Sequence, residues 1–276
     1  MNIGFATNAW GVVLADSNAT TNVNEAFYIS TGSDEEAIQK IGKAGFRYIE
    51  MLDGNLLQYE NREEELRQLL KASNTELLTV YCAANFIYDE ILEEELYKIE
   101  RALKIAKKFG AKFLVAGGGA RRSNGICEGD YKKLGKALDK VVDLAKKYEI
   151  SAGYHPHIGA LVLTEGEIDK LMASTKMELI PDFGHICSGG GNPVAIVEKY
   201  AERISYVHLV DHDGADFRLF GEGAIDFNEI KQLLDANGKE VVYTIEAAYQ
   251  ADDYFDGNHD LMLQTAAKHV KEFFHE

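Results

Sequence analysis

Short apolar runs alternate with longer amphipathic segments along the whole chain. In the longer segments the apolar residues recur at helical spacing, whereas each short run has the length of a buried strand. The runs are Ile3–Ala6, Tyr48–Met51, Leu77–Cys82, Lys112–Ala116, Ile150–Tyr154, Met177–Pro181, Ile204–Val210 and Glu240–Glu246. This pattern predicts eight strands that alternate with helices, and therefore an α/β fold with parallel strands.

The ends of several predicted helices carry capping residues. Ser33–Glu36 and Thr164–Glu167 have the capping-box spacing, and Asn192-Pro193 combines an N-cap with a proline at the first helical position. Asp226 can cap the helix that follows it, and Gly110 suits the end of the helix before it. These boundaries support the alternation of strands and helices.

A strand count of eight at a length of 276 residues favours a single closed (β/α)8 TIM barrel over an open doubly wound sheet. Only 3 prolines and no low-complexity tract leave little that resembles a linker, so we expect one catalytic domain over residues 1–276. The chain has no GxGxxG after a first strand and no GxxxxGK[ST]. The nucleotide-binding α/β folds therefore lack their signatures.

One segment breaks the regular spacing of strands and helices. It covers about residues 8–33, follows the first strand, and is long and polar. Trp10, Phe27 and Tyr28 are embedded in it. Long loops of this kind often form lids or substrate walls. A lid or wall and a simple surface excursion are left as equal alternatives.

Charge and composition exclude several classes of function. The net charge is −16, which repels phosphate backbones and argues against a nucleic-acid partner. No apolar run approaches membrane-spanning length, and Met1–Phe5 does not resemble a signal sequence. The 3 cysteines are far apart, as expected for reduced thiols. We expect a cytoplasmic protein without a membrane partner, and a homo-oligomer is compatible with the sequence.

Four residues that commonly bind metals fall at the ends of four successive apolar runs. They are His155, Asp182, His208 and Glu246, separated by intervals of 27, 26 and 38 residues. Each interval fits about one strand plus one helix, and a parallel barrel brings the ends of all its strands to one rim. Two imidazoles and two carboxylates at that rim predict a divalent-metal site.

Histidines are concentrated around the same strand ends. Five of the 8 histidines lie within 58 residues of one another, namely His155, His157, His185, His208 and His212. A single histidine at a strand end is more often a structural residue than a ligand. Four candidate ligands in register on consecutive strands reverse that expectation and favour a metal-dependent enzyme over a non-catalytic sugar-binding barrel.

The second half of the chain resembles the xylose isomerase-like barrel superfamily. The matching blocks are Tyr154–Gly159, Thr164–Met172, Asp182–His185, Asn192–Arg203, Val207–Asp211 and the sequence from Gly221 to Phe227. Within the superfamily the chain is most similar to the inosose dehydratases. The close resemblance covers roughly residues 150–250, and the barrel pattern covers the whole chain.

The resemblance implies roles for individual residues. Members of the superfamily bind one divalent ion through ligands at the ends of strands five to eight, commonly Glu, Asp, His and Glu. This chain has His155 where epimerases have glutamate, which disfavours symmetric proton exchange and favours elimination, as in a dehydratase. His185 and Arg218 match positions that contact substrate oxygens. The superfamily also contains abasic-site endonucleases, which the net charge of −16 argues against.

We therefore expect a dehydratase that removes a proton next to a carbonyl of a keto-inositol or keto-sugar. A divalent ion at the carbonyl stabilises the developing negative charge, and a positioned base accelerates the step. Glu246 is the candidate base, with His157 or His185 as the acid for the departing hydroxide. Asp211 is a candidate acceptor that orients an imidazole. The alternative is a sugar isomerase or keto-sugar epimerase that uses His155 and Glu246 as its acid–base pair.

Other residues support weaker predictions about the ligands. Glu50 ends the second strand and is a candidate for a sugar hydroxyl, although a structural salt bridge is equally expected. Trp10, Tyr81 and Phe86 are candidates for stacking on a sugar ring, although aromatic residues near strand ends more often belong to the core. The ligand set favours Mn²⁺ or Co²⁺, with Zn²⁺ and Fe²⁺ as alternatives, over Mg²⁺. Acidic residues after the seventh strand favour an uncharged sugar or cyclitol.

Overall fold

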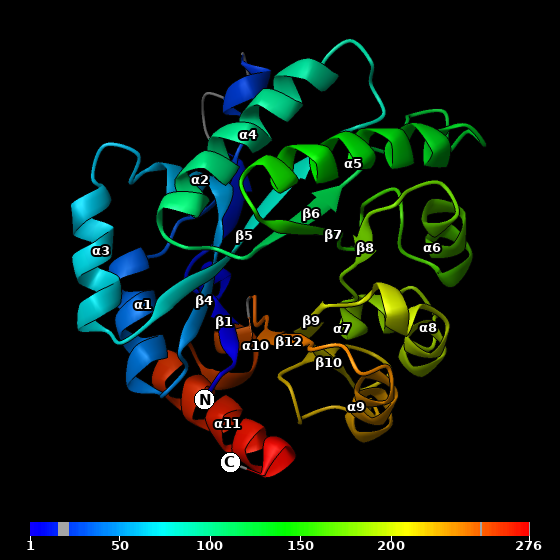
Figure 1. Cartoon of the computed structure of the whole chain (residues 1–276). Helices are drawn as coiled ribbons and strands as arrows, with labels where there is room; N and C mark the ends of the chain where they lie inside the picture. Colours follow the sequence, from blue (N-terminus) through cyan, green and yellow to red (C-terminus); the bar gives the residue numbers. More distant parts are fainter. Residues whose placement is uncertain (16–21, 249, 276) are drawn as a thin grey trace.

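Eight parallel strands form the centre of the molecule, and helices surround them (Figure 1). The computed structural model describes residues 1–15, 22–248 and 250–275. The central strands are β1 (Gly4–Ala6), β4 (Tyr48–Leu52), β5 (Glu76–Ala84), β6 (Phe113–Gly118), β7 (Ser151–Tyr154), β8 (Glu178–Leu179), β9 (Tyr206–Leu209) and β12 (Val242–Ile245). Their order is β8-β7-β6-β5-β4-β1-β12-β9, so consecutive central strands are neighbours.

The two outermost strands of this order meet and close the sheet. Asp182 and His208 form a parallel bridge, and the His208 amide donates to the Pro181 carbonyl at 3.0 Å. The predicted (β/α)8 barrel is confirmed, and each of the eight predicted strands matches an observed one with shifts of a few residues at its ends. The bridge also sets two predicted metal ligands side by side.

Helices connect the strands on the outside of the barrel (Figure 1). They are α1 (Asp34–Lys43), α2 (Asp53–Leu57), α3 (Glu63–Ala72), α4 (Leu92–Lys108), α5 (Asp130–Lys147), α6 (Glu165–Met172), α7 (Phe183–Ser188), α8 (Pro193–Tyr200), α9 (Phe227–Ala236), α10 (Gln250–Phe255) and α11 (His259–Phe274). The predicted caps Ser33, Asn192 and Asp226 each accept a hydrogen bond from an amide of the first turn. Glu167 accepts from the Thr164 amide at 2.9 Å, as a capping box requires.

Loss of the α8 cap should have a modest cost. Asn192 Oδ1 accepts from the amides of Val194 and Ala195 at 2.9 and 3.4 Å. We expect Asn192→Ala to destabilise the protein by about 1 kcal/mol, because these two amides lose their partner. Chemical denaturation measures this change, with Asn192→Ser as a control that keeps a capping oxygen. Equal destabilisation by both variants would show that the cap does not carry the effect.

The hydrophobic core has two parts, one on each side of the strand layer. Inside the barrel, a small cluster includes Leu52, Tyr81, Val115, Ile180 and Tyr206. A much larger cluster fills the space between the strands and the surrounding helices. This two-layer packing is that of a barrel whose interior is filled by side chains. Tyr81, a member of this inner cluster, contacts the predicted ligand His155, with 5.7 Å between their ring centroids.

The long segment after β1 is partly structured. It contains the antiparallel strands β2 (Val13–Ala15) and β3 (Tyr28–Ser30) and the short 3₁₀ helices η1 (Thr7–Ala9) and η3 (Val23–Glu25). Residues 16–21 of this segment lie outside the described residues. The described part is therefore a ribbon rather than a plain loop, and it contributes to a cavity wall described below.

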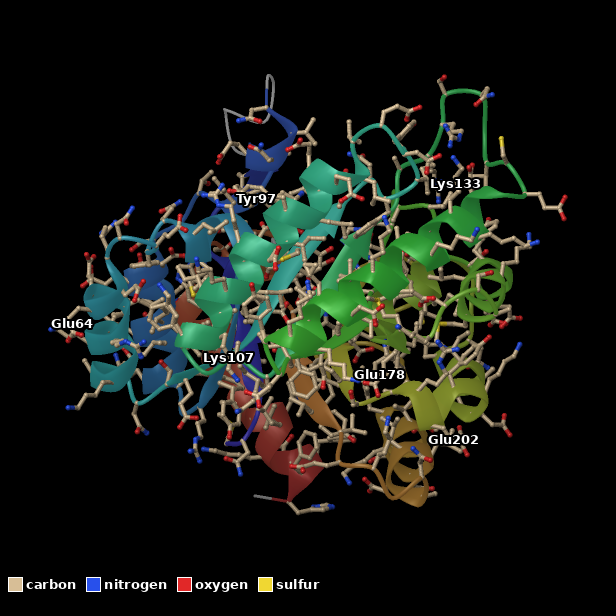
Figure 2. All side chains as sticks on the ribbon, turned by 45° about the horizontal axis from the view of Figure 1, so that its top comes forward. Glu64, Tyr97, Lys107, Lys133, Glu178 and Glu202 are labelled. Carbon is tan, nitrogen blue, oxygen red and sulfur yellow. The ribbon has the colours of Figure 1, made fainter. Side chains whose placement is uncertain are left out.

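Charged side chains cover the outer helices. Figure 2 shows three of these side chains, Glu64 on α3, Lys107 on α4 and Lys133 on α5. Lys107 pairs with Glu149 and Lys133 pairs with Asp89, each at 2.5 Å. Among the described residues, no helix is both long and apolar enough to cross a membrane.

Candidate metal and active site

The four predicted metal ligands lie together at one end of the barrel. Single side-chain atoms of His155, Asp182, His208 and Glu246 all lie within 4.8 Å of one another. His155 follows β7, Asp182 follows β8, His208 is in β9 and Glu246 follows β12. The side chains of the first three are fully buried, and Glu246 is 9% exposed. Neighbouring strands of a parallel barrel therefore bring these four residues together as their spacing predicted.

Buried polar atoms without hydrogen-bond partners make this cluster a candidate cation site. Both ring nitrogens of His155 and Oδ2 of Asp182 are buried and have no hydrogen-bond partner among the described residues. Asp182 Oδ1 accepts from the His185 amide at 2.8 Å as the N-cap of α7, which fixes the orientation of the carboxylate. A buried polar group without a partner is costly. A divalent cation fits this donor set, because it would bind the free nitrogen and oxygen atoms.

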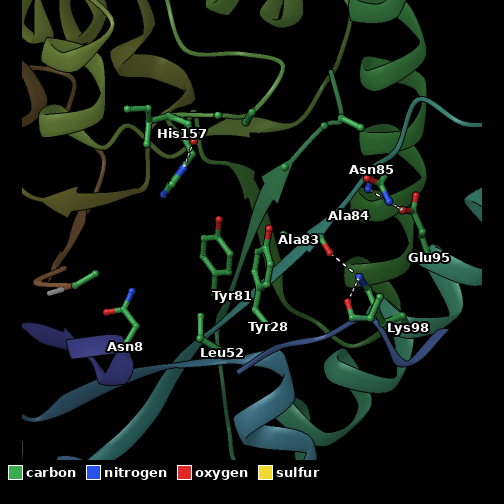
Figure 3. A pocket seen from close by; sticks show the side chains of 18 of the residues that line it. Asn8, Tyr28, Leu52, Tyr81, Ala83, Ala84, Asn85, Glu95, Lys98 and His157 are labelled. Carbon is green, nitrogen blue, oxygen red and sulfur yellow. Dashed lines mark hydrogen bonds between the residues drawn. The ribbon is translucent and has the colours of Figure 1, made fainter. Parts of the chain in front are cut away.

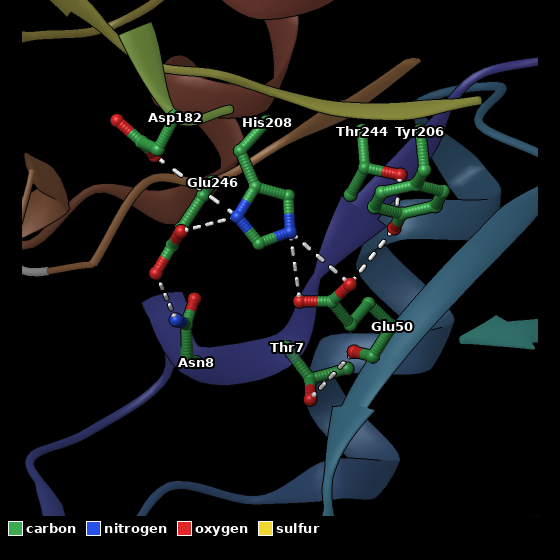
Figure 4. A network of polar contacts seen from close by, with 8 residues as sticks. All are labelled: Thr7, Asn8, Glu50, Asp182, Tyr206, His208, Thr244 and Glu246. Carbon is green, nitrogen blue, oxygen red and sulfur yellow. Dashed lines mark hydrogen bonds and ion pairs between the residues drawn. The ribbon is translucent and has the colours of Figure 1, made fainter. Parts of the chain in front are cut away.

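His208 connects the cluster to a third carboxylate, that of Glu50 (Figure 4). Its Nδ1 lies 2.8 Å from Glu246 Oε2 and 4.0 Å from Asp182 Oδ2. Its Nε2 lies 3.1 Å from Glu50 Oε1. Glu50 therefore orients the ring so that Nδ1 faces the two carboxylates, as outer carboxylates do for metal-binding histidines.

Further hydrogen bonds hold the carboxylates in place (Figure 4). The Tyr206 hydroxyl donates to Glu50 Oε2 at 2.8 Å and lies 2.6 Å from Thr244 Oγ1. On the other side, Asn8 Nδ2 donates to Glu246 Oε1 at 2.9 Å. Glu246 thus has one oxygen fixed by Asn8 and the other directed towards His208.

The charges of the cluster depend on one another. Burial raises the pKa of Asp182 well above its usual value, and the nearby Glu246 adds to this shift. Burial opposes the charged form of His208, but the carboxylates of Glu50 and Glu246 raise its pKa well above the usual range. Burial likewise opposes ionisation of Glu246, yet His208 holds its pKa well below the usual range. A positive charge among the carboxylates is therefore favourable, and a divalent ion can replace the His208 proton in this role.

Two more histidines extend the cluster outward. The ring centroids of His157 and His185 lie 3.9 Å apart, and each ring lies 5.6 Å from that of His155. His157 Nδ1 lies 2.6 Å from the Ile158 carbonyl oxygen, which can only accept. His157 Nδ1 therefore carries the proton. Burial, with a smaller contribution from His157, lowers the pKa of His185 to about 3.

A cavity of about 620 Å³ opens beside this cluster. Its wall includes Asn8 and Tyr28 from the segment after β1, Tyr81 from β5, and His157 and Glu246 from the cluster. Figure 3 shows Tyr28 and Tyr81 between Asn8 and the far end of the cavity. The segment after β1 thus forms a wall of the cavity, which is one of the two alternatives left open for it. A second cavity of about 270 Å³ lies on the other side of His157 and Glu246.

Two charged residues lie at the far end of the larger cavity, and both have hydrogen-bond partners in the backbone of the protein (Figure 3). Lys98 Nζ donates to the carbonyls of Ala26 and Ala83 at 2.8 and 2.6 Å. Glu95 accepts from the amides of Asn85 and Phe86. Because both charges are engaged internally, this wall is suited to an uncharged polar molecule.

Two predicted substrate contacts lie away from the larger cavity. Trp10 is 3% exposed, stacks on His259 at 4.8 Å between ring centroids and lines neither cavity. The structure thus places Trp10 in the core rather than against a substrate. Arg218 pairs with Asp213 at 2.6 Å and covers the ring of Tyr254, which lines the smaller cavity. Arg218 therefore packs against Tyr254, a residue of the wall of the smaller cavity.

The contacts of Asp211 and Glu50 bear on their predicted roles. The carboxylate of Asp211 contacts no imidazole ring among the described residues; it accepts from the amides of His212, Gly221, Gly223 and Ile225 and so fixes the loop after β9. Glu50 is 3% exposed and is engaged by His208 and Tyr206 rather than facing either cavity. Of the two alternatives for Glu50, the structure supports the structural ion pair.

Sequence reasoning missed several residues of the site. Asn8, Tyr206 and Thr244 contact the predicted ligands or their partners, and none was singled out from the sequence. Asn8 follows β1, so its position at a strand end was an available signal. Tyr206 and Thr244 lie within apolar strands and give no signal in a single sequence.

A family model and individual relatives match this chain. The model described as xylose isomerase-like TIM barrel matches residues 38–272. An inosose dehydratase from Clostridium beijerinckii is 30% identical over 273 residues, which cover 86% of this chain and 89% of the relative. An inosose dehydratase from Clostridium perfringens is 29% identical and covers 77% of this chain and 82% of its own length.

Solved structures share the fold at low sequence identity. A probable 3-DHS dehydratase from Bacillus anthracis superposes with a TM-score of 0.71 at 16% identity, covering 98% of this chain and 99% of its own. The IOLI protein, solved with a binding zinc atom, superposes with a TM-score of 0.75 at 18% identity, covering 99% and 98%. The solved structures share the barrel fold with this chain. In each of these comparisons the matched region covers most of both chains. The chain therefore belongs to the xylose isomerase-like TIM barrel family, and its relatives identify it as an enzyme.

Proposed function

We propose that the chain is a divalent-metal-dependent dehydratase that acts on a keto-inositol or a related keto-sugar. The observation that carries this proposal is the set of unpaired buried atoms of His155 and Asp182, which face His208 and Glu246 beside a cavity. The inosose dehydratase relatives indicate the substrate class. His155, Asp182, His208 and Glu246 would hold one ion, with Mn²⁺ or Co²⁺ favoured and Zn²⁺ or Fe²⁺ as alternatives.

A bound ion would polarise the substrate carbonyl and so increase the acidity of the neighbouring C–H. Glu246 is the proposed base, because it borders both cavities and His208 keeps its carboxylate ionised. Asn8 holds its Oε1 at 2.9 Å and so fixes the carboxylate orientation. Proton removal by a group in this position contributes about 10²–10⁴-fold to the rate.

A histidine is the proposed acid for the hydroxide that leaves. His157 and His185 both border the smaller cavity next to Glu246. Burial holds His185 neutral, since its pKa is lowered to about 3, so this ring can donate a hydrogen bond but is a poor source of a proton. His157 is more exposed, and its ring is oriented by the Ile158 carbonyl. We therefore assign the proton transfer to His157 and a positioning role to His185.

The proposed substrate is uncharged. Lys98 and Glu95, the charged residues at the far end of the larger cavity, are both engaged by internal partners. A phosphate or carboxylate on the substrate would find the Lys98 ammonium already bonded to two backbone carbonyls. The aromatic rings of Tyr28 and Tyr81 suit the apolar faces of a cyclitol or sugar ring.

Reaction in D₂O with detection by NMR tests the proposal. The metal is first removed with a chelator, and Mn²⁺ or Co²⁺ is then added to enzyme and a panel of keto-inositols and ketoses. We expect loss of water and an unsaturated or diketone product only after the ion is restored. Deuterium incorporation with a new stereoisomer would instead establish an isomerase or epimerase. Undiminished turnover without any divalent ion would refute metal dependence.

Replacement of Glu50 distinguishes its two candidate roles. Because Glu50 orients His208 through Nε2, we expect Glu50→Gln to weaken metal binding or activity by about 10–100-fold. Calorimetric titration with Mn²⁺ measures the affinity, and steady-state kinetics measure KM at saturating metal. Tyr206→Phe is the matched control, since it removes only the hydroxyl that bonds Glu50. A raised KM with unchanged metal affinity would restore Glu50 as a substrate contact.

A further inference from the structure

Three imidazoles lie together on the outer side of the four-ligand site. Single ring nitrogens of His155, His157 and His185 all lie within 4.8 Å of one another, close enough to bind one ion. This second group shares only His155 with the cluster that contains Asp182 and His208. We propose that it is a second cation site, selective for borderline transition ions such as Zn²⁺ and Co²⁺.

Each of the three rings has a nitrogen available for a metal. His157 Nδ1 is occupied by the Ile158 carbonyl at 2.6 Å, which leaves the lone pair on Nε2. His185 Nδ1 is buried and has no hydrogen-bond partner among the described residues. In metal-binding histidines the second ring nitrogen is commonly held by an acceptor, and the Ile158 carbonyl holds Nδ1 of His157 in this way.

His155 can serve both sites because it has two free nitrogens. Neither Nδ1 nor Nε2 has a partner among the described residues, although the ring is fully buried. Its centroid lies 4.8 Å from that of His208 and 5.6 Å from those of His157 and His185. A ring with two free nitrogens has a donor atom for each ion.

The chemistry of the ligands decides which ions the second site accepts. The four-ligand site combines two imidazoles with two carboxylates and suits many divalent ions, whereas the second site offers imidazoles alone. Imidazole favours Zn²⁺, Co²⁺ and Ni²⁺, and ions that prefer oxygen ligands bind such a set weakly. The site is accessible, because His157 lines both cavities and His185 lines the smaller one.

Occupation of the second site would engage both histidines proposed as acid and positioning residue. This consequence depends on the proposed dehydratase mechanism, whereas the binding itself does not. Excess Zn²⁺ should therefore inhibit turnover of the Mn²⁺ enzyme, while excess Mn²⁺ should not. Stoichiometry measured without substrate keeps a failure of the site distinct from a failure of the proposed reaction.

Metal stoichiometry tests the second site directly. Equilibrium dialysis followed by metal analysis should give two Zn²⁺ per chain for the wild type and one Mn²⁺ per chain. His157→Ala and His185→Ala should each bind a single Zn²⁺. His212→Asn is the matched control and should keep two, because His212 lies outside both groups and asparagine can still accept from the Gly214 amide.

Two outcomes would overturn the second site. One is a single Zn²⁺ on the wild-type chain at saturation. The other is two Zn²⁺ on both His157→Ala and His185→Ala, since the second ion would then bind elsewhere. Circular dichroism of each variant verifies that loss of an ion does not reflect unfolding.

Discussion

Glu246→Gln is expected to lower kcat by about 10²–10⁴-fold while the barrel still folds. Glutamine has the same length, and its Oε1 can still accept from Asn8 Nδ2, which lies 2.9 Å from Glu246 Oε1. The substitution removes the negative charge that faces His208 at 2.8 Å and would bind both the metal and the substrate proton. Both the chemical step and metal affinity should therefore fall, with little change in stability from packing.

Two measurements separate these effects of Glu246→Gln. Deuterium exchange into the keto substrate at saturating metal reports proton removal, and calorimetric titration reports metal affinity. Glu229→Gln, on the exposed face of α9, is the matched control and should behave as the wild type. If the variant exchanged deuterium at the wild-type rate, a residue other than Glu246 would be the base.

His208→Ala should abolish metal binding and also cost about 3–5 kcal/mol of stability. His208 lies between Glu246 and Glu50, at 2.8 and 3.1 Å, and its side chain is fully buried. Its removal leaves the Glu50 carboxylate buried with, among the described residues, only the Tyr206 hydroxyl as a hydrogen-bond donor from a side chain. We expect a folded protein with a lower midpoint of chemical denaturation and no saturable Mn²⁺ binding.

The double variant His208→Ala/Glu50→Gln identifies the source of the instability. Neutral glutamine needs no positive partner, so part of the lost stability should return, whereas metal binding should not. Failure of the double variant to recover stability would indicate that the cavity left by the ring, not the unpaired carboxylate, causes the loss. Wild-type metal affinity in His208→Ala would contradict the assigned site.

The strands and several helix ends could be predicted from the sequence, because hydrophobic periodicity and capping residues are local patterns. The alternation of apolar runs with amphipathic segments predicted all eight strands, and caps such as Asn192 and Asp226 located helix ends. The candidate ligands could be grouped from spacing alone. In a parallel barrel every strand end reaches the same rim, so position along the chain gives position in space.

Side-chain direction and partner choice could not be obtained in the same way. An aromatic residue such as Trp10 fits a core or a sugar equally well by its chemistry, and only its packing against His259 places it in the core. Likewise, Glu50 ends a strand as the ligands do, but its register relative to β9 directs it to His208.

By itself, the sequence determined the barrel and the residues that line its rim, since both follow from periodicity and chain order. The tertiary structure alone decided that Tyr206 and Asn8 hold the carboxylates, that Asp211 fixes a loop, and that three histidines form a second group. The contacts of Asn8 with Glu246 and of Tyr206 with Glu50 join residues that are far apart in the chain. They depend on strand register and rotamer, which no local pattern encodes.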